Sequence, residues 1–335
     1  MSKPDLNTNI QQVARRAGVS AATVSYVLNE TRKVRPETRR RVLAAIHALG
    51  YSPNMSARNL AIGRSHILGL IISDIRNPFF PEITTSFQEA ANVCDMEVIV
   101  MNTNYNPLLT NSSVERLLRW QVAGMAILTS EIEPSMMHLL ESQNVCSVYL
   151  DLGHVNRHMS NIAVDYEHGV VAALRHLEAL GHRRIGFVGG LPSLVSAQER
   201  KKAFVACAEK ISHVQTKIID SDFTVQGGYV ACSRLLAGFP ATAILAANDL
   251  MAIGAMHYAF DRGIEIPAHL SVVGFDDIAF AQSTFPPLTS VAIPRAEIGN
   301  IAFSALWSMI SDSGTGREYQ VRTNLVIRDS TAQVP

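Results

Sequence analysis

The sequence of 335 residues lacks several features that would place it in a common class. No apolar run reaches the roughly 18 residues of a membrane span, and the first ten residues, MSKPDLNTNI, hold no apolar core of signal-peptide length. The four cysteines are too widely spaced for any CxxC pair, which favours buried free thiols over metal ligation or disulfides. We therefore expect a cytoplasmic protein with no membrane partner, no metal and no cofactor.

The short motifs of the commonest enzyme sites are also missing. The sequence contains no G-x-G-x-x-G, G-x-x-x-x-G-K-[ST], G-x-S-x-G or H-E-x-x-H pattern, which removes the usual nucleotide, esterase and zinc sites. GFVGG at 186–190 is only a weak glycine-rich turn, and the 11 histidines show no metal-ligand spacing. These absences argue against an enzyme, the main rival function for a chain that alternates strands and helices.

Excess charge is absent from the chain as a whole, because 29 basic residues balance 29 acidic ones. The balance hides an uneven distribution, since residues 1–65 hold 11 basic and three acidic residues. That segment has a net charge of +8, so the remainder has a net charge of −8. A basic head on an acidic body is typical of a nucleic-acid-binding segment joined to a domain with another task.

The basic head shows the apolar spacing of three short helices. Apolar residues recur at helical intervals over 10–17 and 19–28, with Gly18 between the two segments and Ser20 placed to cap the second. A third helix is predicted from Pro36 to Leu49, with a buried stripe of Val42, Leu43, Ile46 and Leu49. Spacing and charge together favour a helix-turn-helix, and a plain helical bundle with a solvated basic face is the alternative.

From residue 67 onward, short apolar runs alternate with helical patterns. Strands are predicted at 67–73, 97–101, 125–128, 146–150, 184–190, 216–220, 242–247 and 270–275. Helices are predicted at 80–93, 112–121, 136–142, 168–180, 197–208, 226–236, 250–262 and 295–311. Near-continuous apolar strands alternating with helices are typical of parallel sheets covered on both faces, so we expect an α/β body of two successive doubly wound subdomains.

Polar side chains follow the predicted strands of the body. Ligands of doubly wound sheets bind outside the carboxyl ends of the strands. This rule selects Asp74, Asn77, Asp151, Gly189, Ser193, Ser196, Asn248, Asp249, Asp276 and Asp277. Carboxylates, amides and hydroxyls near rings such as Phe79 and Phe223 suit a sugar or similar polyol, because they pair with hydroxyls and cover the ring face.

Several longer segments carry a family resemblance. The head contains VARRAGVSAATVSYVLN (13–29), and the body contains DIRNPFF (74–80), LGHRRIGFVGG (180–190), AANDLMAIGA (246–255), LSVVGFDD (270–277) and PPLTSV (286–291). Together these segments, which span nearly the whole chain, resemble the lactose-repressor / galactose-repressor (LacI/GalR) family of transcription factors. The resemblance implies an all-α helix-turn-helix DNA-binding head, a periplasmic-binding-protein-like α/β body, and a repressor whose operator affinity a small molecule controls.

In that family the second helix of the head enters the major groove, and its base-reading positions fall on Ala21, Ala22 and Tyr26. Alanine offers the groove only a methyl group, so Tyr26 is the main candidate for a polar base contact. The resemblance also implies phosphate contacts from Thr23, Ser25, Asn29 and Arg32. Local capping or helix back-bonding is an alternative for the first two.

The resemblance further implies a hinge helix between head and body, folded on DNA with its counterpart from a second subunit. Asn54 caps this helix, Ala57 permits close approach, Arg58 contacts phosphate or groove, and Leu60 wedges a base step of the minor groove. The segment is too short to be a stable helix alone. Without the resemblance, Leu60 would be interpreted as the first core residue of the body.

By position, the resemblance implies effector contacts from Asn77, Phe79, Asp151, Ser196, Arg200, Phe223, Asn248 and Asp276. As alternatives, Asn248 and Asp276 are helix caps and Arg200 is a surface or interface charge. Two departures from the family make the ligand harder to name: Leu152 follows Asp151 where many relatives have arginine, and Ile293 replaces a usual polar residue. A phosphorylated, nucleobase or aromatic glycoside effector is therefore an alternative to a simple sugar.

These observations predict three parts: a DNA-binding domain at 1–52, a hinge at 53–65, and an effector-binding and dimerisation domain at 66–335. Within the last, the N-subdomain takes about 66–165 plus 293–320 and the C-subdomain about 166–292 plus 321–330, and the two close on the effector. A pseudo-palindromic double-stranded operator implies a homodimer, with a tetramer as the alternative. Residues 79–92 and 250–262 are the candidate subunit contacts.

Overall fold

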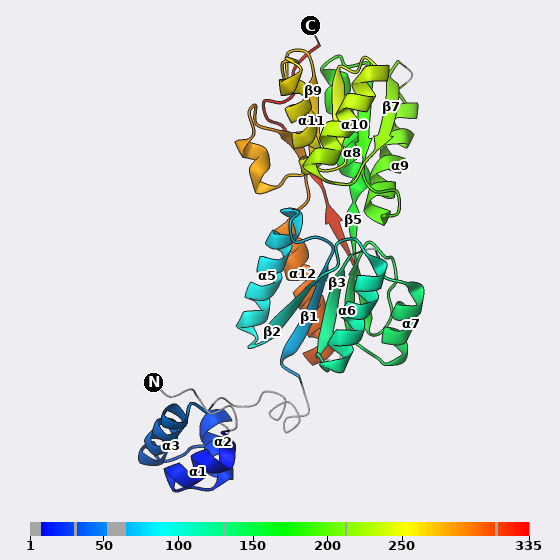
Figure 1. Cartoon of the computed structure of the whole chain (residues 1–335). Coiled ribbons are helices and arrows are strands. Elements are labelled where there is room, and N and C mark those ends of the chain that lie inside the picture. The colour runs from blue at the N-terminus through cyan, green and yellow to red at the C-terminus, as the bar shows by residue number, and fades with distance from the viewer. Residues whose placement is uncertain are drawn as a thin grey trace. The chain divides into compact units, whose positions relative to one another are not determined.

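This computed structural model describes residues 8–29, 32–51, 65–129, 131–211, 213–311 and 314–334. The chain forms two compact units, Met1–Ser65 and His66–Pro335, which are drawn together in Figure 1. They are called the head and the body below. None of the helices in the described ranges is long and apolar enough to cross a membrane.

The head consists, in its described part, of α1 (Ile10–Ala17), α2 (Ala21–Asn29) and α3 (Pro36–Leu49). Gly18 ends α1 with a φ of 64°, a left-handed conformation that glycine adopts without strain. The core is small and closes around Val13, Val24 and Val42, which are fully buried. These three helices confirm the helix-turn-helix prediction and leave little apolar surface to stabilise the unit.

One detail of the predicted head core is wrong. Leu43 was expected in the buried stripe of α3, but its side chain is 46% exposed. The buried positions of α3 are Val42 and Ala45, three residues apart on one side of the helix, and Leu43 lies about 100° further round.

The body contains two six-stranded sheets, in the orders β11-β5-β4-β3-β1-β2 and β12-β10-β9-β8-β6-β7. The strands of the first are β1 (Ile67–Ile72), β2 (Glu97–Asn102), β3 (Gly124–Leu128), β4 (Ser147–Leu150), β5 (Met159–Asp165) and β11 (Glu318–Arg322). Those of the second are β6 (Arg184–Gly189), β7 (Gln215–Asp220), β8 (Ala243–Ala246), β9 (Ser271–Asp276), β10 (Thr289–Ala292) and β12 (Asn324–Val326). All neighbours pair in parallel except β10 and β12.

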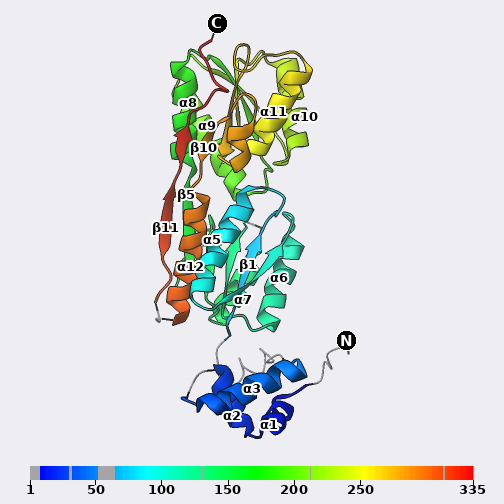
Figure 2. The same ribbon diagram turned by 90° about the vertical axis from the view of Figure 1, so that its left-hand side faces the viewer.

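Helices cover both faces of each sheet (Figures 1 and 2). The first sheet carries α5 (Phe79–Val93), α6 (Pro107–Arg119), α7 (Pro134–Ser142) and α12 (Arg295–Ser311). The second carries α8 (Tyr166–Ala179), α9 (Val195–Glu209), α10 (Val225–Gly238) and α11 (Asp249–Asp261). This arrangement confirms the predicted pair of doubly wound subdomains, which bury an extensive apolar core.

The chain passes between the two sheets where β5 leads into α8, where β10 leads into α12, and between β11 and β12. β5 and β11 lie side by side along this junction, as both views show. The hydroxyl of Thr323 donates to the carbonyl of Asp165 over 2.8 Å and ties two of these crossings together. The carboxyl ends of β1, β3 and β4 therefore face those of the second sheet across a shared cleft.

Candidate functional site

The three residues predicted to read bases lie on α2 and differ in exposure. Ala22 is exposed, while Ala21 and Tyr26 are partly buried. The guanidinium of Arg32 lies 5.1 Å from the centre of the Tyr26 ring. Arg32, the predicted phosphate contact, therefore stacks on Tyr26, the predicted base contact.

Ser20 and Thr23 form the start of α2. The Ser20 hydroxyl accepts from the backbone N–H of Thr23 over 3.2 Å and also pairs with the Thr23 hydroxyl over 2.9 Å. The expected cap at Ser20 is therefore present. Thr23 takes part in this local capping, which was the alternative to a phosphate contact. Of the other predicted contacts, the side chain of Asn29 and all of Asn54, Ala57, Arg58 and Leu60 lie outside the described residues.

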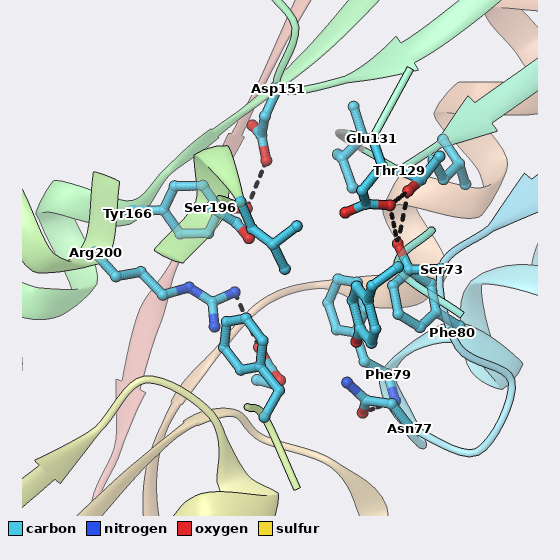
Figure 3. A pocket seen from close by; sticks show the side chains of 16 residues that line it. Ser73, Asn77, Phe79, Phe80, Thr129, Glu131, Asp151, Tyr166, Ser196 and Arg200 are labelled. Atoms are coloured by element: carbon cyan, nitrogen blue, oxygen red, sulfur yellow. Dashed lines mark hydrogen bonds and ion pairs between the residues drawn. The ribbon is translucent and has the colours of Figure 1, made fainter. Parts of the chain in front are cut away.

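The body contains a pocket between its two subdomains (Figure 3). Its described lining consists of Ser73, Asn77, Phe79, Phe80, Tyr105, Leu128, Thr129, Glu131, Leu150, Asp151, Tyr166, Leu194, Ser196, Arg200, Phe223 and Asp276. Seven of the eight predicted effector contacts are in this set. They come from the carboxyl ends of strands in both sheets, which is where the rule for doubly wound folds places ligands.

A buried ion pair forms one wall of the pocket. Arg200, on α9, lies 3.2 Å from a carboxylate oxygen of Asp276, the last residue of β9, and both side chains are almost fully buried. The same guanidinium donates to the Ala247 carbonyl and packs over the rings of Tyr166 and Phe275 at 4.8 and 4.2 Å. Its Nε is buried and has no hydrogen-bond partner among the described residues, which leaves a donor suited to a ligand oxygen.

Burial sets the protonation of the carboxyl groups in the pocket. Loss of solvation raises the pKa of Asp276 to about 6, against the opposing attraction of Arg200 and Arg295. Loss of solvation also raises the pKa of Asp151, although the Tyr166 hydroxyl donates to it over 2.5 Å and the Val164 N–H over 2.9 Å. Both carboxyl groups are held by the protein before any ligand arrives.

Five aromatic side chains and three leucines are in the described lining, and four of the rings form two pairs. Phe79 and Phe80 meet edge to face with centroids 5.1 Å apart, and Tyr105 stacks on Phe223 across the cleft with centroids 6.4 Å apart. A Cβ on residue 190 would lie 2.0 Å from the Phe223 ring, so Gly190 leaves the space that this ring fills. The glycine-rich turn at 186–190, a weak motif in the sequence, thus leaves room for the Phe223 ring.

The backbone is strained at the same pocket. Tyr105, Asp151, Phe223 and Asp276 have φ angles of 56°, 60°, 65° and 103°, the left-handed region that non-glycine residues seldom adopt. Each lies at or shortly after the carboxyl end of a strand. These four are among the nine non-glycine residues of the described ranges with positive φ, and such strain persists only where the surrounding structure holds it.

Asn248 is the predicted effector contact that does not line the pocket. Its side chain caps α11 by accepting from the Met251 N–H over 2.9 Å, and it donates to the Phe223 carbonyl over 3.1 Å. Asn248 is therefore a helix cap, the alternative that the sequence left open, and its side chain also holds the backbone of Phe223 in place. Its neighbour Asp249 is fully buried and accepts from the Ile278 N–H over 2.7 Å, which anchors the turn after Asp276.

Several lining residues were not predicted, among them Tyr105, Thr129, Glu131 and Tyr166. Thr129 and Glu131 follow the predicted strand at 125–128, and Tyr105 follows the one at 97–101, so the strand-end rule contained the signal for all three. Tyr166 follows β5, a strand that the sequence did not reveal. No group of histidine, cysteine or acidic side chains in the described ranges has the arrangement of a metal site.

Comparisons with known proteins agree with this architecture. The model of bacterial regulatory proteins, lacI family, matches residues 9–54, and that of the periplasmic binding protein-like domain matches residues 174–331. The HTH-type transcriptional repressor PurR of Mannheimia succiniciproducens is 31% identical over 331 residues, covering 97% of this chain and 99% of the relative. Catabolite control protein A of Priestia megaterium is 32% identical over 305 residues, covering 90% and 92%.

Solved structures give the same result. The lac repressor dimer bound to operator and the anti-inducer ONPF superposes with a TM-score of 0.84 and 27% identity, over 97% of this chain and 99% of that one. A transcriptional regulator CelR–cellobiose complex superposes with a TM-score of 0.71 and 26% identity, over 97% and 100%. A helix-turn-helix head on a two-subdomain binding body is the architecture of a DNA-binding regulator. The chain belongs to the lacI family and is a DNA-binding transcriptional repressor of that family.

Proposed function

We propose that this repressor binds a small, sugar-like effector in the pocket between the body subdomains and that the effector changes its affinity for operator DNA. The observation that carries this proposal is the Arg200–Asp276 pair. Both side chains are buried, Arg200 also packs on aromatic rings, and the Arg200 Nε has no hydrogen-bond partner in the part of the chain that the structure describes. A buried donor without a partner costs stability, so its presence in a strained, polar pocket favours a ligand-binding role.

The lining supports a ligand with hydroxyl groups and one apolar face. Ser196, Asp151 and Asn77 supply hydroxyl, carboxylate and amide groups, while Phe79 and Phe223 supply ring surfaces. Because these residues come from both subdomains, the ligand favours one closure of the cleft, which couples binding to conformation. Such coupling is typically worth about 1 to 3 kcal/mol, or about 5- to 150-fold in operator affinity.

On the DNA side, we propose that α2 occupies the major groove, with Ala21 and Ala22 against thymine methyl groups and Tyr26 as the polar base contact. Ser25 and Arg32 contact phosphates, and the hinge residues of 53–65 bind the minor groove as the sequence predicts. A two-fold operator requires two heads, so the repressor acts as a homodimer through body surfaces that include residues 79–92 and 250–262. The three-part division at 1–52, 53–65 and 66–335 belongs to this proposal.

The base contact is tested with operator DNA selected from a random-sequence library. Tyr26→Ala should weaken binding to the selected operator about 5- to 150-fold, the range of one good base contact, and should weaken binding to random duplex much less. Tyr26→Phe separates the hydroxyl from the ring that Arg32 stacks on. Equal losses on both DNAs for Tyr26→Ala would show that Tyr26 does not read bases.

The effector is tested on the full-length repressor by thermal shift against sugars, sugar derivatives and nucleobases, followed by operator titrations with each stabilising compound. We expect at least one compound to raise the melting temperature and to change operator affinity. Arg200→Met should remove both responses. Stabilising compounds that leave operator affinity unchanged would contradict effector control, and sedimentation of a monomeric operator complex would contradict the homodimer.

A further inference from the structure

The two sheets of the body are joined along one edge and separate along the other. The strands at which the chain crosses between them, β5, β10, β11 and β12, lie at one end of each strand order, and Figure 2 shows these crossings along one side of the body. β2 and β7 form the opposite edges, each four strands away from β5 or β10. Four strand spacings are about 19 Å, so a rotation of about 10° at the crossings moves the loops after β2 and β7 apart by about 3 Å.

An aromatic pair joins these two loops across the cleft. Tyr105 follows β2 and Phe223 follows β7, and their rings stack with centroids 6.4 Å apart and planes inclined by 25°. Aromatic rings interact at centroid separations of about 4.5 to 7 Å, so an opening of about 3 Å breaks this contact. The pair therefore lies where opening of the cleft separates the two subdomains most.

The turn that carries Tyr105 is fixed by its backbone. Asn104 and Tyr105 are two successive left-handed residues, with φ angles of 51° and 56°. The Thr103 N–H donates to the Ile72 carbonyl over 3.0 Å, and the Asn106 N–H donates to the Thr103 carbonyl over 3.0 Å, which closes the turn. Such a conformation persists in residues other than glycine only where the fold holds it. The end of β2 thus presents the Tyr105 ring to the cleft in a defined position.

Phe223 is held in a similar way on the other subdomain. Its φ is 65°, its carbonyl accepts from the Asn248 side-chain amide over 3.1 Å, and Gly190 leaves the room that its ring fills. The next residue, Thr224, caps α10 by accepting from the Gly227 N–H over 2.9 Å. Two fixed turns, one from each subdomain, therefore meet ring to ring.

Tyr105 also occupies part of the pocket. Loss of solvation raises the pKa of its hydroxyl, and the hydrogen-bonded side chain of Asn77 acts in the opposite direction. Asn77 is one of the predicted effector contacts, so Tyr105 engages it before any ligand arrives. The free volume of the pocket is about 60 Å³, whereas pockets that hold small molecules are about 300 to 1,000 Å³. A ligand of that size enters only if the cleft opens.

We propose that Tyr105 and Phe223 form an aromatic clasp that keeps the cleft of the ligand-free repressor closed, and that Tyr105 controls access to the pocket. Rotation at the crossings separates the two rings, and closure brings them together again. The inference rests on the proposed function only in treating the pocket as the effector site, because the clasp itself acts without any ligand. Removal of either ring shifts the body toward the open arrangement by about 2- to 10-fold, the range of one aromatic pair.

The first experiment measures access to the pocket of the full-length protein. Ser196, in the lining at the start of α9, is replaced by cysteine, and its modification by iodoacetamide is followed by peptide mass spectrometry. On this Ser196→Cys background, Tyr105→Ala should raise the rate at residue 196 by about 2- to 10-fold. Tyr105→Phe keeps the ring and should leave the rate unchanged. The matched control is Trp120→Ala, at the opposite end of α6 and 50% exposed, which should also leave it unchanged.

The native cysteines distinguish opening of the cleft from a general loss of stability. Cys232 is fully buried on α10, so its rate of modification reports unfolding of the C-subdomain. We expect Tyr105→Ala to leave that rate unchanged. An unchanged rate at residue 196, or an equal rise at residue 196 and Cys232, overturns the proposal. A rise in Tyr105→Phe as large as that in Tyr105→Ala also overturns it, because the ring would then not be the part that closes the cleft.

The second experiment looks for the effect of one ring on the opposite subdomain. Hydrogen–deuterium exchange of the ligand-free, full-length protein measures the opening of the turns at 103–106 and 220–225. Tyr105→Ala should speed exchange at 220–225 and Phe223→Leu should speed exchange at 103–106, each by about 2- to 10-fold, whereas Trp120→Ala should change neither. A ring that stabilises only its own turn changes exchange there alone, and that result overturns the clasp.

Both measurements are made without an effector, so they are separate from the test of effector control. Equal rates of modification and exchange in all variants overturn the clasp and leave effector control standing. A thermal-shift screen in which no stabilising compound changes operator affinity contradicts effector control. The clasp is then still supported if Tyr105→Ala opens residue 196 and the turn at 220–225.

Discussion

The head and the body solve the problem of recognition in opposite ways. The head has a core of a few small side chains and a net charge of +8, and Ala22 and Arg32, which are proposed to contact DNA, lie on its surface. The body has a net charge of −8, an extensive core, and a site whose central pair, Arg200 and Asp276, is nearly inaccessible to solvent. A polyanion is bound from outside by exposed charge, whereas a small ligand is bound inside a preorganised pocket.

The comparison shows where each region can be changed without loss of fold. In the head, the proposed contacts Ala22 and Arg32 are exposed, so changing them should leave the fold intact. In the body, Arg200 and Asp276 of the proposed effector site are themselves buried, so a change to the site is also a change to stability. Each prediction below tests this contrast, from the largest expected effect to the smallest.

The largest effect is expected from Val24→Asp in the head. Val24 is fully buried in a small core, and an unpaired carboxylate there costs several kcal/mol, which is comparable to the whole stability of a three-helix unit. We expect operator binding, measured by fluorescence anisotropy, to fall below detection while the calorimetric unfolding transition of the body keeps its temperature. The control Leu43→Asp introduces the same charge at an exposed position on α3 and should leave operator binding nearly unchanged. A body transition that moves with Val24→Asp would contradict the independence of the two units.

Arg200→Met should have the second largest effect, and this time on the body. It leaves Asp276 buried without its cation, and breaking one side of a buried pair typically costs about 3 to 5 kcal/mol. Denaturant unfolding of the full-length protein measures this loss in the body transition. The matched control is Arg76→Met. Its partner Asp74 lies 2.9 Å away, but the Arg76 side chain is 74% exposed, so a much smaller loss is expected because solvent screens the pair. Similar losses in both variants would show that burial does not increase the contribution of Arg200 to the unfolding free energy.

The sequence revealed the head and the order of the body elements because both depend on local periodicity. It missed β5, β10, β11 and β12, for physical reasons that their residues make plain. EYQVR of β11 and NLV of β12 are short and partly exposed, and MSNIAVD of β5 is broken by polar side chains, so none resembles the continuous apolar run of a central parallel strand. These strands are placed by tertiary contacts at the junction.

The site was predictable to the extent that it lies at strand ends. Asp151 and Asp276 follow predicted strands, and the rule for doubly wound sheets found them. Tyr166 was missed together with β5, the strand that presents it. The role of Tyr105 depends on which side chains meet across the cleft, and a single sequence does not contain that pairing. Asn248 shows the converse. It follows a predicted strand, as the rule requires, but its side chain caps α11.

A third prediction concerns pH. Burial raises the pKa of Asp276 from its ordinary value of 3.8 to about 6, so between these values the folded protein binds more protons than the unfolded chain. The contribution of Asp276 to stability is therefore present below pH 4 and is lost as the pH rises through 6. Burial also raises the pKa of Asp249. Arg200 and Arg295 act in the opposite direction and lower the pKa of Asp276. The neighbouring Asp277 is paired with Arg328.

This pH dependence is measured as the difference in unfolding free energy between the wild type and Asp276→Asn from pH 4 to pH 7. We expect the wild type to lose on the order of 3 kcal/mol relative to the variant over that range, since each unit of pKa shift corresponds to about 1.4 kcal/mol. The asparagine has no proton to lose, so its curve lacks this component. A difference that is flat, or that grows in favour of the wild type as the pH rises, would refute the raised pKa.

The smallest effect is expected from Glu82→Gln on α5. Arg295, at the start of α12, is buried and donates to Glu82 Oε2 on α5 over 2.7 Å, and it also donates to the carbonyls of Asp276 and Ile293. Because the Glu82 side chain is 44% exposed and Arg295 keeps its carbonyl partners, loss of the carboxylate should cost about 1 kcal/mol or less in unfolding free energy. Arg295→Met removes all three bonds and should cost more. Suppose that Glu82→Gln lowered the unfolding free energy as much as Arg200→Met. Exposure would then not determine how much a charged side chain contributes to the stability of the body, and the contrast between exposed and buried sites would be contradicted.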